Sequence, residues 1–403
     1  MGGEGPQLRR QLGLAGATAL ALGAIIGAGI FVTLGEAAQS AGLALPAAIL
    51  LAAGAATLNG LSSAELGVAI PRAGGAYEFG YQLLTPVVGF AAGWLFLLAA
   101  TTASGTYTLT FANYLQPLFP GFPLRLLAIG LGLAVLAVNV VGAQLSGRVN
   151  ALPVIVKIGV LVAFVTLGLT SVGRAATGGA QVSQPGGVLQ AAALFFFAFT
   201  GYARPVTVVE EVRNPRRDLP RAVIAALAVS TALYLVVAVV ALRLLGAAGL
   251  ASSSAPLRQA LVGNAPVWAP DLMSVGAFVA TATVLLTELW GLSRLAFAMA
   301  RRGDLPRALS ALTARGVPLR ALLSLGSVVI LLAATADLTP VLAASSLSLL
   351  LYYAITNLAA LRLPPSARLY PPAVPALGFA ACLSLALLLP AQSLLVVGGA
   401  LAV

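Results

Sequence analysis

The chain has 403 residues, of which 60% are hydrophobic and only 8% charged, and its formal net charge is +11. A soluble domain carries about 25% charged residues because its surface faces water, so this composition excludes a water-soluble globular protein. The chain contains no histidine, which excludes histidine metal sites and histidine proton relays. We expect neither a metal ion nor a cofactor.

Long apolar runs follow one another along the chain, separated by charged or turn-forming residues. A transmembrane helix needs about 20 largely apolar residues, so these runs predict an all-α polytopic membrane protein with about 12 transmembrane helices, the last of them short. The runs cover residues 12–34, 43–70, 84–115, 123–143, 149–171, 187–210, 220–245, 267–300, 319–336, 339–361, 372–389 and 391–403.

Basic residues set the orientation of the chain. If the N-terminus is cytoplasmic, 16 of the 22 Lys and Arg residues fall at the cytoplasmic face and four fall outside. Cytoplasmic loops of membrane proteins carry such an excess. The pattern predicts a multi-pass protein of the inner (cytoplasmic) membrane with a cytoplasmic N-terminus. The topology therefore accounts for the positive charge. We expect the protein to be embedded in the lipid bilayer and not to bind nucleic acid.

Glycines interrupt two of the predicted helices in a matching way. The first helix contains Gly23, Gly27 and Gly29, and the sixth contains Gly201 shortly before Pro205. The two helices are five spans apart and cross the membrane in opposite directions. Paired interruptions of this kind predict an inverted repeat with a binding site near the bilayer midplane. The alternative is that the glycines only permit close helix packing.

The inverted repeat divides the chain into two related halves within one domain. The predicted parts are a single transmembrane transporter domain (1–403), a first repeat of helices 1–5 (12–171), a second repeat of helices 6–10 (187–361), and helices 11–12 (372–403).

Four short motifs follow in a fixed order along the chain. They are Ile26-Gly-Ala-Gly-Ile-Phe31, Pro71-Arg-Ala-Gly-Gly-Ala-Tyr77, Glu210-Glu-Val-Arg-Asn-Pro-Arg-Arg-Asp-Leu-Pro220 and Ala298-Met-Ala-Arg-Arg-Gly303. In these motifs the chain resembles the amino acid–polyamine–organocation (APC) permeases, over nearly its whole length. The resemblance implies the five-plus-five inverted-repeat fold of the leucine-transporter type. It also implies secondary transport of amino acids or related amines by alternating access, and no enzyme activity.

The resemblance further implies where the substrate binds. An amino acid zwitterion needs donors for its carboxylate and acceptors for its ammonium group, and broken helices expose both kinds of backbone group. At the break of the first helix, the carboxylate would be held by the amides of Gly27, Ala28 and Gly29. The carbonyl of Ile25 would lie nearby. At the break of the sixth helix, the ammonium group would be held by the carbonyls of Phe197, Ala198 and Thr200. Tyr202 would form one wall of the pocket for the substrate side chain.

Lys157 is the only lysine of the chain and lies inside the fifth predicted helix. A charge inside the membrane is costly and therefore a functional candidate. The resemblance implies that its ammonium group bridges the carbonyls of Gly23 and Ile26, where sodium-coupled relatives bind a cation. Because burial disfavours a charged amine, such a lysine can exchange a proton, and we expect it to couple transport to protons. The alternative is a lysine that snorkels to the cytoplasmic interface.

The predicted pocket lacks an acidic side chain where cationic amino acid carriers of this family often have one. Ala203 and Ala99 occupy those positions, and the neighbouring Arg204 would repel a cationic substrate. The sequence therefore predicts a neutral amino acid. Glu288 of the eighth helix is an accessory candidate that either lines the same cavity or forms a structural ion pair, and Arg204 is its expected partner.

These features together predict a proton-coupled permease for neutral amino acids. Two alternatives remain open. A sodium-independent amino acid or amine exchanger would use Lys157 as a fixed charge. A membrane-embedded amino acid sensor would bind without transport, but a sensor normally carries a soluble signalling extension, which the apolar runs do not indicate.

Overall fold

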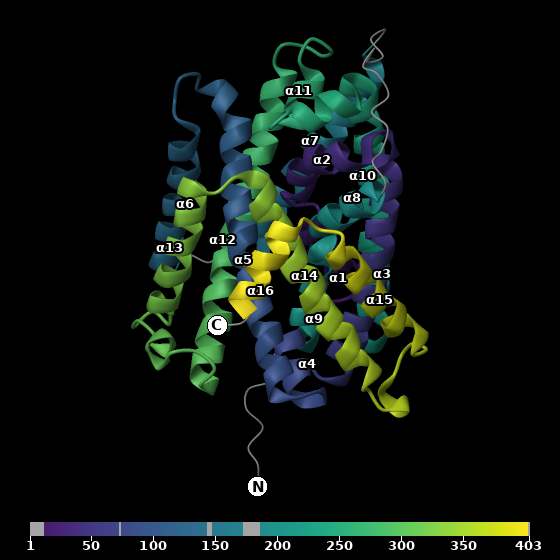
Figure 1. The fold of residues 1–403 in the computed structure, drawn as a ribbon, viewed down its shortest axis with the longest axis vertical. Helices are drawn as coiled ribbons and strands as arrows, with labels where there is room; N and C mark the ends of the chain where they lie inside the picture. Colours follow the sequence, from purple (N-terminus) through teal and green to yellow (C-terminus); the bar gives the residue numbers. More distant parts are fainter. Residues whose placement is uncertain (1–11, 72–73, 143–146, 172–185, 402–403) are drawn as a thin grey trace.

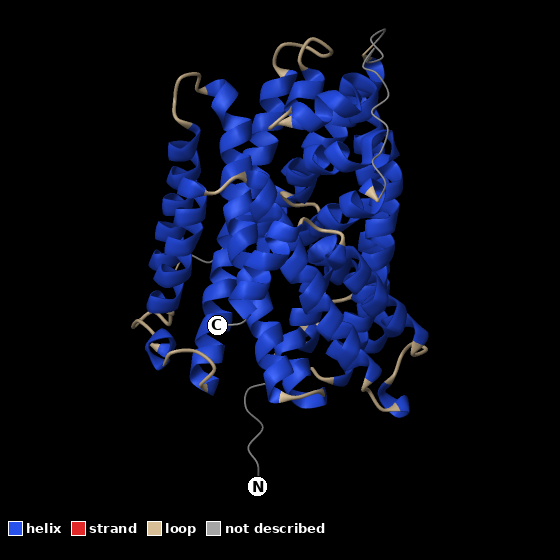
Figure 2. Cartoon of the chain, in the orientation of Figure 1, coloured by secondary structure: helices blue, strands red, loops and turns tan. Residues whose placement is uncertain are grey.

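Helices make up nearly all of the computed structural model, which describes residues 12–71, 74–142, 147–171 and 186–401; no strand occurs among these residues (Figure 2). The helices of the first half are α1 (Leu14–Ile25), α2 (Gly29–Ala41), α3 (Leu45–Ala69), α4 (Ala76–Leu83), α5 (Pro86–Leu115), α6 (Leu124–Val141) and α7 (Gly147–Thr170). Those that follow are α8 (Gly187–Phe195), α9 (Arg204–Thr207), α10 (Pro215–Ser252), α11 (Pro256–Leu261), α12 (Ala269–Arg302), α13 (Leu319–Thr335), α14 (Leu338–Leu361), α15 (Ala373–Leu387) and α16 (Ala391–Leu401).

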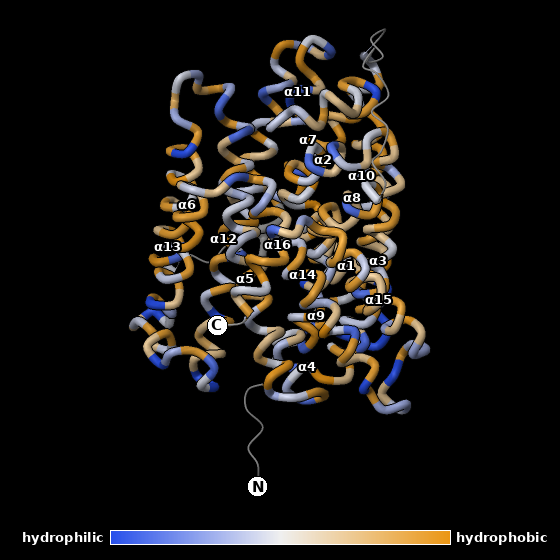
Figure 3. The backbone as a smooth tube through the Cα atoms, in the orientation of Figure 1, coloured by the Kyte–Doolittle hydropathy of each residue, from blue (hydrophilic) through white to orange (hydrophobic). Residues whose placement is uncertain are grey.

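Seven helical segments within the described part of the chain are long and apolar enough to cross a membrane, and the bent pair α15–α16 raises the number to up to eight. Helices α1 and α13 are apolar but shorter. Hydrophobic residues dominate the middle of the molecule, as Figure 3 shows. The protein is therefore an all-helical, multi-pass membrane protein. The count of about twelve spans and the inverted repeat stay predictions.

Three of the predicted spans differ from continuous straight helices. The first run is interrupted between α1 and α2, and the sixth contains α8, a 3-10 segment and α9. The last run forms α16, which turns by 113° from α15. The indole of Trp94 in α5 donates a hydrogen bond to the carbonyl of Ala400 (2.6 Å). The short last helix thus folds back toward α5 instead of continuing the direction of α15.

The apolar core consists of two large clusters of buried side chains. One is built mainly from α2, α3, α8, α10 and α14 and also includes the end of α1, and the other is built mainly from α5, α6, α12 and α13. Helix α14 packs against α5 and α15, and α7 packs against α12 and α10. In Figure 1, α6 and α13 lie at one side of the molecule and α3 and α15 at the other. The two interrupted helices belong to the first cluster.

A polar cluster joins α4 to the end of α12. Gly303 ends α12 with a φ of 99°, and the amide of Asp304 donates to the Met299 carbonyl (2.9 Å), which is a glycine-based helix cap. The Asp304 carboxylate accepts hydrogen bonds from the hydroxyls of Tyr77 (2.6 Å) and Tyr81 (2.7 Å). Burial and this carboxylate raise the pKa of Tyr81 to about 12, so the hydroxyl stays a donor at physiological pH.

We expect Asp304→Ala to destabilise the protein, because the substitution leaves two partly buried tyrosine hydroxyls without their acceptor. An unsatisfied polar group of this kind costs about 1–3 kcal/mol. The measurement is the thermal unfolding temperature of the purified protein in detergent. Asp337→Ala is the matched control, since both members of the Arg125–Asp337 pair are exposed, Asp337 by 82%, and such surface pairs contribute little. Equal unfolding temperatures for the two variants would contradict this account.

Candidate functional site

The first transmembrane helix is interrupted at Ile26–Ala28, which we call the first break. Ile26 has a ψ of 69°, outside the helical range, and the amide of Gly27 donates to the carbonyl of Ile25 (2.7 Å). Helix α2 begins at Gly29, and the first amides of a helix have no acceptor within the helix. The amides and the positive end of the helix dipole therefore meet at the first break, where they suit a carboxylate.

The sixth predicted span is interrupted at Phe196–Ala203, the second break, which forms a 3-10 helix between α8 and α9. A 3-10 stretch inside a helix has poorer hydrogen-bond geometry and often marks a functional hinge. The Thr200 hydroxyl donates to the carbonyl of Phe197 (3.0 Å), and the hydroxyl of Tyr353 in α14 donates to the carbonyl of Thr200 (3.4 Å). Carbonyls at this break therefore serve as acceptors for side-chain hydroxyls.

Glycines allow the two breaks to touch. A Cβ atom placed on Gly29 would lie 2.5 Å from the Cα atom of Ala198, and one placed on Gly201 would collide with the backbone of Ala24 and Ile25. Only a residue without a side chain permits this approach of backbone to backbone. The structure thus brings the donors predicted in the first helix and the acceptors predicted in the sixth together in one place.

Tyr234 of α10 lies between the two breaks. Its hydroxyl donates to the Ile25 carbonyl (2.7 Å) and is 3.4 Å from the Ala198 carbonyl. The side chain is fully buried, and its ring packs against Phe195 and Phe199. The sequence analysis missed this residue because one tyrosine in an apolar run looks like ordinary core. Its polar hydroxyl, which needs a buried partner, was the available signal.

Tyr202 is placed away from the contact between the breaks. Its ring lies 5.2 Å from the ring of Tyr353, and a Cβ placed on Gly60 of α3 would lie 3.4 Å from one of its ring atoms. A cavity of about 30 Å³ lies nearby and is lined by Tyr353, Ala203 and residues of α3, α4 and α14. This volume holds about one or two water molecules and not an amino acid.

Lys157 of α7 points toward the first transmembrane helix. Its ammonium group donates to the carbonyl of Gly23 (3.1 Å), and the residue is only 3% exposed. A lysine that snorkels keeps its charge in water, so this burial contradicts the snorkelling alternative. Within the part of the chain that the structure describes, the expected second bond to Ile26 is not formed. The non-helical ψ of Ile26 turns its carbonyl out of the helical direction that the Gly23 carbonyl keeps.

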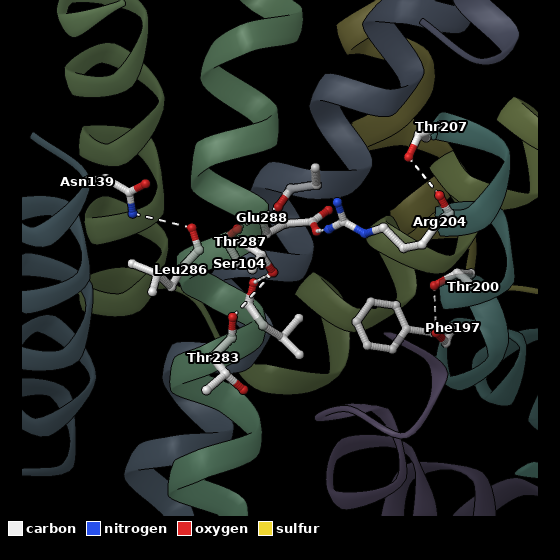
Figure 4. Close-up of polar contacts among 12 residues, drawn as sticks. Ser104, Asn139, Phe197, Thr200, Arg204, Thr207, Thr283, Leu286, Thr287 and Glu288 are labelled. Carbon is white, nitrogen blue, oxygen red and sulfur yellow. Dashed lines mark hydrogen bonds and ion pairs between the residues drawn. The ribbon is translucent and has the colours of Figure 1, made fainter. Parts of the chain in front are cut away.

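Arg204 and Glu288 form an ion pair across the site. The guanidinium of Arg204, just after the second break, lies 3.3 Å from the carboxylate of Glu288 in α12. Figure 4 shows the two side chains pointing toward each other, with Phe197 and Thr200 beside Arg204. The pairing that the sequence analysis hypothesised is present.

Comparison with known proteins gives a consistent result. The family model for amino acid permeases matches residues 16–400. The chain belongs to the amino acid permease family. An uncharacterized transporter of Mycobacterium tuberculosis is 39% identical over 393 residues, which cover 96% of this permease and 88% of the relative. A branched-chain amino acid permease of Bacillus subtilis is 32% identical over 75% of this chain and 70% of its own.

A third relative is named for a different class of substrate. Cationic amino acid transporter 4 of Mus musculus is 30% identical over 89% of this permease and 61% of its own length. Family membership and these relatives place the permease among amino acid transporters rather than among enzymes, in agreement with the resemblance seen in the sequence motifs.

We expect Gly29→Ala to weaken amino acid binding by about tenfold, because the added Cβ would press on the Ala198 backbone and overpacking costs about 1–3 kcal/mol. Gly27→Ala should have a smaller effect, since the atoms nearest to its Cβ would be a methyl group of Val284 at 3.0 Å and the carbonyl oxygen of Ala24 at 3.3 Å, neither as close as Ala198 is to a Cβ on Gly29. The control is Gly54→Ala in α3, where no atom lies within 4 Å of the added Cβ. Binding is measured with labelled leucine in detergent, and equal affinities for the three variants would contradict the contact between the breaks.

Proposed function

We propose that this permease carries a neutral amino acid across the cytoplasmic membrane by alternating access and is coupled to protons through Lys157. The observation that carries the proposal is the meeting of the two breaks through Gly29 and Gly201. It supports one site with amide donors on one side and carbonyl acceptors on the other, which is what a zwitterion requires.

In this proposal the amides of Ala28 and Gly29 bind the substrate carboxylate, together with that of Gly27, which gives up its bond to the Ile25 carbonyl. The carbonyls of Phe197 and Ala198, with that of Thr200, bind the ammonium group. Each of these carbonyls already receives or closely approaches a hydroxyl, from Thr200, Tyr234 or Tyr353. Because a carbonyl oxygen has two lone pairs, it can accept the substrate as well or exchange one partner for the other.

The preference for a neutral substrate rests on the charges around the site. Ala203 and Ala99 provide no carboxylate for a cationic side chain, and the only acid near Arg204 in the described contacts, Glu288, is engaged in the ion pair. The relatives include both a branched-chain amino acid permease and a cationic amino acid transporter. The charge arrangement favours the first of these for this permease.

The transport cycle requires the broken helices to move. The cavity of about 30 Å³ beside the second break is too small for an amino acid, so binding and release need a more open state. We propose that the halves 12–171 and 187–361 form the inverted repeat that supplies this motion. The end of the molecule that carries α4 then faces the cytoplasm, as does the N-terminus.

Lys157 is suited to link a proton to this motion. Its bond to the Gly23 carbonyl connects α7 to α1, next to the first break. A charged ammonium group holds this contact more strongly than a neutral amine does. A change of protonation therefore shifts the balance between two states of α1, provided that the proton binds the states with different affinity. The same bond equally supports a sodium-independent exchanger in which Lys157 stays charged.

Replacement of Lys157 separates the two modes of coupling. Lys157→Ala should abolish accumulation of leucine driven by an inward proton gradient in proteoliposomes while leaving leucine binding detectable. Lys157→Arg should fail in the same assay, because arginine does not lose its proton at accessible pH. If Lys157→Arg accumulates leucine like the wild type, Lys157 is a fixed charge and does not carry the coupling proton. If the wild type itself accumulates no leucine under the proton gradient, the permease is an exchanger.

Competition for uptake tests the substrate class. Excess valine or isoleucine should inhibit the uptake of labelled leucine, whereas excess arginine or lysine should leave it nearly unchanged, because Arg204 repels a cationic side chain. The uptake is measured in proteoliposomes at fixed pH with equal concentrations of each competitor. Strong inhibition by either cationic amino acid would show that the substrate class is wrong.

A further inference from the structure

We propose that the Arg204–Glu288 ion pair is a two-sided charge filter at the side-chain end of the substrate pocket, excluding cationic amino acids through Arg204 and acidic ones through Glu288. This inference rests on the proposed function of the two breaks. It assigns the selectivity for neutral substrates to two residues on different helices, each of which masks the charge of the other.

The position of the pair relative to the breaks supports this role. Val284 is one turn before Glu288 in α12, and a Cβ on Gly27 would lie 3.0 Å from its side chain. Glu288 is thus about 5–6 Å along the helix from the first break. Arg204 follows Thr200 and Gly201 of the second break by one turn. The two charges therefore stand about one helical turn from the backbone groups that would hold the substrate.

The walls between the breaks and the ion pair are apolar and aromatic. Phe197 packs against Tyr107 of α5, with 5.6 Å between the ring centroids, and Val284 lies beside Gly27. A neutral side chain finds apolar surface here, and a longer side chain reaches the pair. In Figure 4 the carboxylate of Glu288 meets the guanidinium end of Arg204, and the ring of Phe197 lies below the Arg204 side chain.

The ion pair is not fully enclosed. The Arg204 side chain is 38% exposed and that of Glu288 is 20% exposed. Thr283, Val284 and Thr287 on the same face of α12 are also only partly buried. A filter requires a pair that a substrate side chain can approach, and this partial exposure meets that requirement.

The charges themselves predict opposite selectivity changes. A cationic substrate side chain could pair with Glu288 only by displacing Arg204, and an acidic side chain could pair with Arg204 only by displacing Glu288. Either exchange leaves a poorly solvated charge without its partner, which is strongly unfavourable. Removing Arg204 removes the group that repels a cationic substrate and leaves Glu288 unpaired to attract that substrate. Removing Glu288 has the same effect for an acidic substrate, which the unpaired Arg204 then attracts.

The experiment compares the purified wild type with Arg204→Gln, Glu288→Gln and the double variant. Each protein binds labelled leucine in detergent in the presence of unlabelled arginine, glutamate or valine. In Arg204→Gln, half-inhibition by arginine should need about tenfold less competitor than in the wild type, because a charge-assisted hydrogen bond is worth at least that factor. In Glu288→Gln, half-inhibition by glutamate should likewise need about tenfold less competitor than in the wild type. In the double variant, the concentrations of arginine and of glutamate for half-inhibition should both stay at the wild-type values.

Arg258→Gln is the matched control, because Arg258 forms a comparable pair with Asp271 (3.1 Å) near α11, outside the site. Its competition profile should equal that of the wild type. If both single variants keep the wild-type profile while losing thermal stability, the pair is structural and the filter is wrong. If arginine already competes strongly in the wild type, the proposal that the substrate is a neutral amino acid is wrong. The competition profiles of the single variants still decide whether the pair discriminates charge.

Discussion

The site depends on direct contact between the backbones of two interrupted helices. Gly29, directly after the first break, lies against Ala198, and Gly201 of the second break lies against Ala24 and Ile25, directly before the first break. Inside a bilayer, non-helical backbone is tolerated only where protein or an aqueous cavity satisfies its polar groups. Here each break lies against the other, and tyrosine hydroxyls supply the missing donors. Larger residues at either glycine would separate the breaks and leave those groups without partners.

This contact also accounts for where the aromatic and charged side chains stand. Tyr234 of α10 and Tyr353 of α14 each bring one hydroxyl to carbonyls of the breaks. Lys157 contacts the Gly23 carbonyl on one side, and Arg204 meets Glu288 on the other. Because an uncompensated charge in the membrane is expensive, each cation has an acceptor. The charged groups are therefore attached to the segments that move in the proposed transport cycle.

The interruptions were predictable because glycines in the middle of apolar helices are a local signal, and Gly27, Gly29 and Gly201 can be read directly from the sequence. The orientation of Lys157 toward Gly23 followed from family resemblance. The missing bond to Ile26 did not, because it depends on one backbone torsion. Tyr234 was missed since only the folded chain brings α10 against both breaks. The turn of α16 by 113° depends on contacts with α5 that no local pattern records.

The hydroxyl contacts place a condition on how such a site opens. The Tyr234 hydroxyl donates to Ile25, just before the first break, and lies near Ala198 in the second, so it links the two segments without occupying both lone pairs of either carbonyl. Separation of the breaks would break this link and leave a buried donor to find another acceptor. A substrate with both a carboxylate and an ammonium group restores partners on both sides at once. A ligand shifts the equilibrium between states only through such a difference in contacts, and a molecule with one of the two groups would compensate only half of the loss.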